Sequence, residues 1–589
     1  MLRCSLIWAA ALLLMFLAAT ANAEIVADYL MGTDPEFPAP ALVKDFTRDF
    51  KGLWLQALQR PETDYQRLAA ETVARAHEYG IPDLIELAPT LEKILTTSSS
   101  HPSARFAAAR ALIILESHDS AAKLLEAGLN NGADLRQLVE PALADWNFAP
   151  AQTVWMKRLE APQAFPRDLM LALHGLGQSR DKAGLPTISK IAMDLLQPSH
   201  IRLEAAQAAG EIVDSGLETD ADQLVHDRRV SPLINRLCAV RFLSRHSSEQ
   251  ARKLLIELAT DQEPSLAAAA LQRLNEIDPE LVVPMAEQAM QSADMHVREA
   301  GANAYILRPS PDRIKPLARL LDDDHPSLRK LVGESLVKLA DNPQLSEVIR
   351  TESMLLLAGD RWQGQEQATL VLGMLDHKPA ADRLVELLES PRRDVMIAAA
   401  WGLRKLAEPH TIPAIVDKIR RQTLERKDRD VPGFDEQVAH LFEACGKLHV
   451  MDAEPLMMQY VPKEGIRGER ILSRSAAIWA LGHLHAGTPN VSVGDALIAR
   501  VLDDADKPRE IPLVKQMSVV SLVRMNAVQY GRELKSSIAL HTPATPLDLA
   551  TRWAVRELTG EELPASALGR FPDGSWFLEP LESSTSIKP

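Results

Sequence analysis

The sequence predicts an all-α protein, built as an α-solenoid superhelix of about fifteen helical hairpins. Three observations lead to this prediction. An amphipathic helical pattern returns every 31 to 36 residues along much of the chain. Its core positions carry small residues where an isolated helix would carry large ones. Aromatic residues are only 5% of the 589 residues, whereas apolar residues are 46%, so the interior must be built mostly from aliphatic side chains.

The repeated helix is clearest in IRLEAAQAAGEI, which begins at Ile201. Counted from Arg202, small or apolar residues stand at positions +3, +4, +7 and +10, which share one face of an α-helix. Alanines at +3, +4 and +6 would let helices of adjacent repeats approach closely, so this helix belongs in a stack. Further copies begin at Arg105, Arg136, Leu169, Arg236, Ala267, Arg298, Arg329, Gln365, Met396, Val438, Arg474, Lys515 and Thr551.

A second apolar helical segment lies between successive copies, often with a proline near its start. Examples are LPTISKIAMDLL from Leu185 and IKPLARLLDDD from Ile314. Proline suits the first turn of a helix, where its missing N–H has no partner to lose. A polar run such as LLDDDHPSLR from Leu320 would end this helix and cap the next one. Each repeat is therefore predicted to be a pair of helices.

This pattern resembles HEAT repeats across roughly residues 50 to 560. The resemblance is carried by the acidic turn before a basic residue, as in LLDDDHPSLR, and by alanine-rich helices such as RSAAIWALGHL from Arg474. It implies the architecture but no activity, because the matching residues are structural. The arginine that opens most copies is expected to bond to aspartates or backbone carbonyls of neighbouring turns.

The first 23 residues have the layout of a secretory signal peptide, with Arg3 before an apolar run and a small-x-small end at Ala21 and Ala23. We expect cleavage after Ala23 and a periplasmic or secreted protein. The alternative, an uncleaved membrane anchor, is disfavoured because the apolar run is shorter than the roughly 20 residues that span a bilayer.

Breaks in the period give the expected domain organisation. Residues 24–50 would form an extended N-terminal lead-in, residues 51–560 the solenoid, and residues 561–589 a C-terminal cap with a disordered tail. Trp576 and Phe577 would anchor that cap. Two longer stretches, from Arg420 and from His485, are expected to be insertion loops.

The sequence offers little evidence for catalysis, a cofactor or a metal site. The net charge of −15 argues against binding to nucleic acid or anionic lipid. Deoxyhypusine hydroxylases are similar in fold but use several His-Glu dyads for iron, and here only His77-Glu78 occurs. The three aspartates Asp322, Asp323 and Asp324 are expected to form a helix-capping turn. Cys238 and Cys445 are expected to stay unpaired, the first partly exposed and the second buried.

A partner-binding surface is predicted on the second helices of the later repeats. Positions +5 and +9 point away from the apolar stripe, and in HEAT-like arrays the second helices line the concave wall. Residues 365–530 place basic and aromatic side chains there, which would suit an acidic or extended polypeptide. The alternative is that insertion loops cover the two tryptophans and make them core. The candidate residues are Trp401, Trp479, Leu370, Lys338, Lys405, Lys447, His483 and Arg524.

The predicted function is a non-enzymatic scaffold that binds another exported or membrane protein, without nucleic acid and without stable membrane insertion. One alternative is an enzyme or cofactor-handling protein with its site in the insertion loops. Another is an envelope glycan-binding module that uses Trp401 and Trp479 as platforms for sugar rings.

Overall fold

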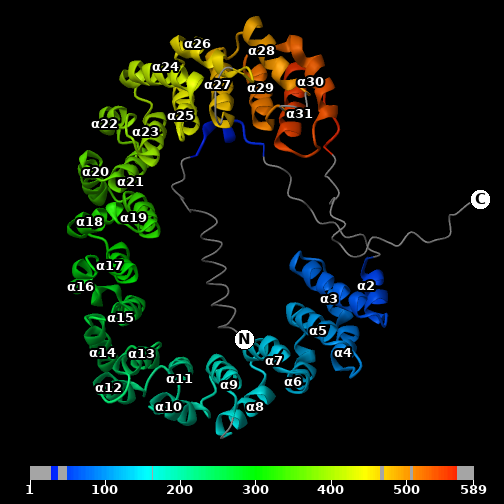
Figure 1. Ribbon diagram of the computed structural model, residues 1–589, viewed down its shortest axis with the longest axis vertical. Helices are drawn as coiled ribbons and strands as arrows, with labels where there is room; N and C mark the ends of the chain where they lie inside the picture. Colours follow the sequence, from blue (N-terminus) through cyan, green and yellow to red (C-terminus); the bar gives the residue numbers. More distant parts are fainter. Residues whose placement is uncertain (1–27, 38–49, 162–163, 465–469, 505–508, 567–589) are drawn as a thin grey trace, which may run out of the picture. The chain divides into compact units, whose positions relative to one another are not determined.

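The computed structural model describes residues 28–37, 50–161, 164–464, 470–504 and 509–566. Within these ranges the chain forms α-helices and short 3-10 helices and no β-strand. Thirty α-helices follow one another as fifteen pairs, from α2 and α3 to α30 and α31 (Figure 1). The predicted all-α solenoid of about fifteen hairpins is therefore confirmed.

The described residues divide into two compact units, each considered by itself. The N-terminal unit contains residues 50–284, with helices α2 (Phe50–Gln59), α3 (Thr63–Glu78), α4 (Ala88–Thr96), α5 (Pro102–Ile114), α6 (Ala121–Asn130), α7 (Ala133–Asp145), α8 (Ala149–Glu160), α9 (Pro166–Gln178), α10 (Leu185–Met193), α11 (Ser199–Ile212), α12 (Glu218–His226), α13 (Pro232–Phe242), α14 (Glu249–Ala259) and α15 (Pro264–Ile277).

The C-terminal unit contains residues 285–566 together with residues 28–37. Its helices are α16 (Val283–Ala289), which begins at the boundary, α17 (Met295–Leu307), α18 (Pro311–Ala318), α19 (Pro326–Leu339), α20 (Pro343–Ala358), α21 (Trp362–Met374), α22 (Ala381–Leu387), α23 (Arg393–Leu406), α24 (Ile412–Asp428), α25 (Phe434–Lys447), α26 (Glu454–Met457), α27 (Ile471–Leu484), α28 (Val491–Val501), α29 (Pro512–Arg524), α30 (Gly531–Ser537) and α31 (Pro546–Thr559). Residues 28–37 contain the 3-10 turn η1 (Leu30–Gly32).

Small residues let the second helices of successive pairs pack closely. In the C-terminal unit, α25 packs on α27, α27 on α29 and α29 on α31, and these odd-numbered helices form one layer (Figure 1). A Cβ added to Gly482 of α27 would lie 2.8 Å from the Cα of Ser521 in α29. In the N-terminal unit, one added to Gly177 would lie 2.8 Å from the Cα of Ala208. The repeated glycine, alanine and serine positions thus set the spacing between helices.

The arginine that opens most copies has the predicted structural role. The Nε of Arg202 donates to the backbone carbonyl of Ala192 at 3.0 Å. The guanidinium of Arg298 pairs with Asp323 at 2.7 Å, and that of Arg474 with Glu510 at 2.9 Å. Each bond holds a second helix to the turn beside it, so these cations are structural.

The aspartate run before α19 is also structural. Besides its pair with Arg298, Asp323 accepts a hydrogen bond from the backbone N–H of His325. Asp322 accepts one from the N–H of Gly364 in the first turn of α21 at 3.1 Å. These bonds satisfy N–H groups that a helix start leaves unpaired, as expected for a capping turn.

Cys238 differs from its prediction, because its side chain is fully buried instead of partly exposed. A second helix inside a solenoid packs against the first helix of its own pair and against both neighbouring second helices. The buried arc is therefore wider than the single stripe used to assign position +2. Burial raises the pKa of the Cys238 thiol to about 11 and that of Cys445 to about 12.

Two predictions concern parts of the chain outside the described residues. The signal peptide at residues 1–23 and the cap residues Trp576 and Phe577 both belong to this group. No described helix has the length and apolar composition needed to cross a membrane.

Candidate functional site

Residues 28–37, which belong to the predicted lead-in, lie against the second helices of the C-terminal unit. Figure 1 draws this N-terminal segment in blue beside α25, α27, α29 and α31. The helical residues that hold it come from α23, α25, α27 and α29, and we call them the docking face. They are Trp401, Arg404, Lys405, His440, Glu443, Trp479, His483 and Arg524.

Asp28 is held at the α23 end of the docking face. Its Oδ1 accepts hydrogen bonds from the indole Nε1 of Trp401 at 2.9 Å and from Nη2 of Arg404 at 2.6 Å. The Nζ of Lys405 lies 3.6 Å from the same oxygen. Partial burial raises the pKa of Asp28, but the Trp401 and Arg404 hydrogen bonds outweigh burial and leave this pKa below its ordinary value. The carboxylate is thus held in its charged form.

Arg404 connects this carboxylate to the middle of the segment. Its Nη1 donates to Oε2 of the fully buried Glu443 at 2.8 Å. The other carboxylate oxygen of Glu443 accepts the backbone N–H of Met31 at 3.0 Å. The ring of Tyr29 stacks on that of His440, with centroids 4.4 Å apart and planes 7° apart. Burial lowers the pKa of His440, so a neutral imidazole faces the tyrosine.

Asp34 is held six residues further along, at α27 and α29. Its backbone carbonyl accepts the indole Nε1–H of Trp479 at 3.1 Å. Its carboxylate pairs with Nε2 of His483 at 3.1 Å and with Nη2 of Arg524 at 2.7 Å. Burial and the charge of Arg524 lower the pKa of His483 to about 4, against the opposing effect of Asp34. At neutral pH, Arg524 is therefore the cation that faces Asp34.

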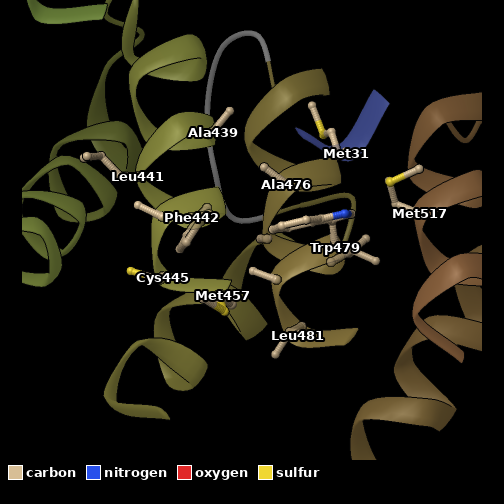
Figure 2. Close-up of a cluster of buried hydrophobic side chains, with 14 of the residues drawn as sticks. Met31, Ala439, Leu441, Phe442, Cys445, Met457, Ala476, Trp479, Leu481 and Met517 are labelled. Atoms are coloured by element: carbon tan, nitrogen blue, oxygen red, sulfur yellow. The ribbon is translucent and has the colours of Figure 1, made fainter. Parts of the chain in front are cut away.

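Apolar contacts add to these polar ones. Met31 is buried among the core side chains of the C-terminal unit, and Figure 2 shows it beside the helix that carries Ala476 and Trp479, facing the helix of Met517. Phe37 packs against Trp553 of α31, with ring centroids 5.4 Å apart. The segment is thus in contact with α23, α25, α27, α29 and α31.

The two tryptophans differ from the predicted register, because both indoles are buried, at 0% exposure for Trp401 and 2% for Trp479. Each ring fits against a glycine of the preceding second helix. A Cβ on Gly373 would lie 2.5 Å from Cζ3 of Trp401, and one on Gly446 would lie 2.9 Å from Cζ3 of Trp479. The expectation that position +5 points away from the core was therefore wrong for these rings. Their N–H edges donate to Asp28 and Asp34 of the N-terminal segment.

Five of the eight predicted partner residues touch the N-terminal segment, namely Trp401, Trp479, Lys405, His483 and Arg524. Lys447 lies next to the site, where its Nζ donates to the carbonyls of Arg404 and Lys405 at 3.4 Å. Leu370 is half-buried on α21 and Lys338 is exposed on α19. The structure records no contact between the segment and these last two residues.

Repeat position and residue type in the sequence do not single out Arg404, His440, Glu443 or the two aspartates of the segment. One signal was present for the tryptophans: a glycine at +8 of one copy precedes a tryptophan at +5 of the next, as in Gly373 with Trp401 and Gly446 with Trp479. No comparable signal ties Asp28 to Arg404, which lie 376 residues apart in the chain.

His483 and His485, two residues apart in the sequence, do not form a shared site. His483 pairs with Asp34, whereas Nε2 of His485 lies 3.3 Å from Glu454. Across the described part of the chain, no three His, Cys, Asp or Glu side chains are grouped as a metal site would require.

The stacked helical pairs make this protein an α-solenoid. A profile of HEAT repeats matches residues 251–337, so this part of the chain is similar to HEAT repeats. A comparison with curated proteins finds no similar sequence.

Solved structures with the same fold include a chain from a study of Kap95p binding to RanGDP. It is 13% identical to this protein, with a TM-score of 0.52. The matched region covers 86% of this chain and 72% of that chain. Yeast importin-beta (Kap95p) is also 13% identical, with 87% and 73% coverage and a TM-score of 0.47. The likeness to the first of these chains, at 13% identity, shows a shared fold and nothing more.

Proposed function

We propose that this protein is a non-enzymatic scaffold that binds an extended acidic segment of a partner protein on the docking face. The observation that supports this proposal is the way the face holds the N-terminal segment. Asp28 and Asp34, six residues apart, each pair their carboxylate with a guanidinium. An indole N–H donates to the carboxylate of Asp28 and to the backbone carbonyl of Asp34. Charge-assisted bonds of this kind orient a bound chain and favour acidic ligands.

The burial of the two indoles favours a peptide over a sugar. A glycan platform needs an open aromatic face, whereas the rings of Trp401 and Trp479 are packed against Gly373 and Gly446. The indole N–H groups donate hydrogen bonds to the bound segment. A ligand at this position therefore needs oxygen acceptors. A backbone carbonyl and carboxylates supply such acceptors.

The proposed setting is the cell envelope, because the first 23 residues have the layout of a cleavable export signal. Fractionation of the native cells and N-terminal sequencing of the purified protein test this location. The expected results are an envelope or extracellular fraction and a mature chain that begins at Glu24. An intact Met1 together with a cytosolic fraction would overturn it.

Photo-crosslinking tests the scaffold itself. A photoreactive amino acid at Lys405, beside Asp28, is expected to capture one polypeptide through an acidic segment, identified by mass spectrometry. The same group at Arg421, which is exposed on α24, is the matched control. Trp479→Phe keeps an aromatic side chain but replaces the indole with a smaller ring that has no N–H, and it should reduce capture at Lys405 while a thermal melt checks that the variant remains folded. Equal capture at both positions, or capture of a glycan, would contradict the proposal.

A further inference from the structure

The N-terminal segment fits the docking face as a ligand would. We propose that residues 28–37 are an intramolecular competitor, which occupies the face until a partner segment of the same chemistry displaces it. This inference rests on the proposed function. The partner segment would carry two carboxylates six residues apart, an aromatic residue after the first, and a turn between them like that of Leu30–Gly32.

The distribution of burial supports an exchangeable occupant. Met31 is the one residue of the described segment that is fully buried. Asp28 and Asp34 keep 45% and 48% of their side-chain surface exposed, and Gly32 and Thr33 are exposed. A segment that belonged permanently to the core would bury most of its side chains. Release of the segment would uncover Met31, whereas the two aspartates already keep about half of their side-chain surface exposed.

The charges support an acidic occupant in particular. The net charge of the chain is −15, yet the docking face presents Arg404, Lys405 and Arg524 to the segment. Glu443 offsets only part of this charge, through its pair with Arg404. The negative charge of the rest of the molecule would repel acidic ligands. The cations of the docking face would attract them at this one surface.

The geometry sets the spacing of the two carboxylates. Six residues of extended chain span at most about 20 Å. The two binding points lie on α23 and α27 to α29, and adjacent helices pack about 8–10 Å apart. Two carboxylates six positions apart in the chain can therefore reach across two helix spacings. Between them, Glu443 accepts the backbone N–H of the fourth residue and His440 stacks on the aromatic ring of the second.

Covalent attachment determines how strongly the segment competes. A ligand that is part of the same chain has a raised local concentration at its binding face. A free peptide with the same contacts must compete with the attached segment, so it would bind the intact chain more weakly than it binds an unoccupied face. A natural partner must make contacts beyond those of residues 28–37, or arrive at high local concentration.

Peptide titration tests the inference. The probe is a fluorescein-labelled peptide, DYLMGTDPEF, with the sequence of residues 28–37. It is titrated by fluorescence anisotropy into the intact chain and into the full-length double variant Asp28→Asn, Asp34→Asn. The control peptide carries asparagine at both aspartate positions. The substituted side chains are about half-exposed, and a thermal melt with circular dichroism checks that the variant remains folded.

We expect the double variant to bind the probe at least tenfold more tightly than the intact chain does. The control peptide should bind the variant at least tenfold more weakly than the probe. Equal affinity of the probe for both chains, or no binding to a folded variant, would overturn the inference. A concentration-dependent dimer of the intact chain by sedimentation would also overturn it, because the segment would then occupy a second copy.

Failure here is separable from failure of the proposed function. If the folded variant does not bind the probe but crosslinking at Lys405 captures a partner, the scaffold stands and the competitor is excluded. If the probe binds but no partner is captured, the competitor stands and the scaffold fails.

Discussion

Arg404 bridges two carboxylates at one point of the docking face. It is almost fully buried, and it donates to Asp28 and to the buried Glu443. Removing one partner of a buried ion pair leaves an uncompensated charge in a medium that solvates it poorly. The side chain therefore has a structural role as well as a binding role.

Arg404→Ala is expected to lower the free energy of unfolding by about 3–5 kcal/mol, because Glu443 would be left without its cation. Arg421→Ala is the matched control, since that guanidinium forms exposed pairs with Glu389 and Asp417. Its expected loss is under about 1 kcal/mol. Denaturant titration followed by tryptophan fluorescence measures both, and equal losses would contradict the role given to Arg404.

His483 should make the stability depend on pH. Its pKa is about 4 in the folded chain and 6.5 when unperturbed, so the unfolded state binds more protons between these values. The contribution of neutral His483 to the free energy of unfolding is fully present above pH 6.5, and it is lost as the pH falls towards 4. We expect the melting temperature of His483→Gln to fall less steeply over this range. The exposed His226 provides the control substitution, and an identical slope in both variants would refute the assignment.

At the scale of elements, glycines decide how closely second helices approach. Alanine normally stabilises a helix relative to glycine. At Gly373, however, the added methyl group would lie 2.5 Å from the ring of Trp401. Packing between helices thus reverses the intrinsic preference at this position.

Gly373→Ala is expected to destabilise the C-terminal unit by about 1–3 kcal/mol through overpacking. Gly52→Ala in α2 is the control, because an added Cβ there meets nothing within 4 Å. That substitution should be neutral or stabilising by up to about 1 kcal/mol. Thermal melts decide between these outcomes. A stable Gly373→Ala variant would show that the Trp401 ring can move aside.

At the scale of the whole molecule, a solenoid is stabilised mainly by contacts between successive repeats. A defect in one repeat should then remain local. Trp155 of α8 offers a test, since it is fully buried against Gly175 of α9 in the N-terminal unit. Its indole also donates to Glu140 of α7.

Trp155→Ala is expected to destabilise its surroundings by about 3–5 kcal/mol. Hydrogen exchange with mass spectrometry should show faster exchange in α7 to α10 and unchanged exchange in α25 to α29. Faster hydrogen exchange in all helices would mean that the chain unfolds as one cooperative unit. That result would contradict the prediction that each repeat is stabilised mainly by its neighbours.

Sequence alone determined the architecture. The period, the small residues of copies such as that from Arg202 and the structural arginines are local signals, because each repeat packs only on its neighbours. It also selected Trp401, Trp479, Lys405, His483 and Arg524 as a group, since helical register places them along one side of successive second helices.

Only the tertiary structure decided what lies on that side. The contact between Asp28 and Arg404 joins residues 376 positions apart, and no periodic pattern encodes such a pairing. The register also misjudged the burial of Cys238 and of the two indoles, because a helix inside a stack is covered by three neighbours instead of one. Long-range contacts and burial depend on which surfaces meet in three dimensions, and a one-dimensional repeat leaves that choice open.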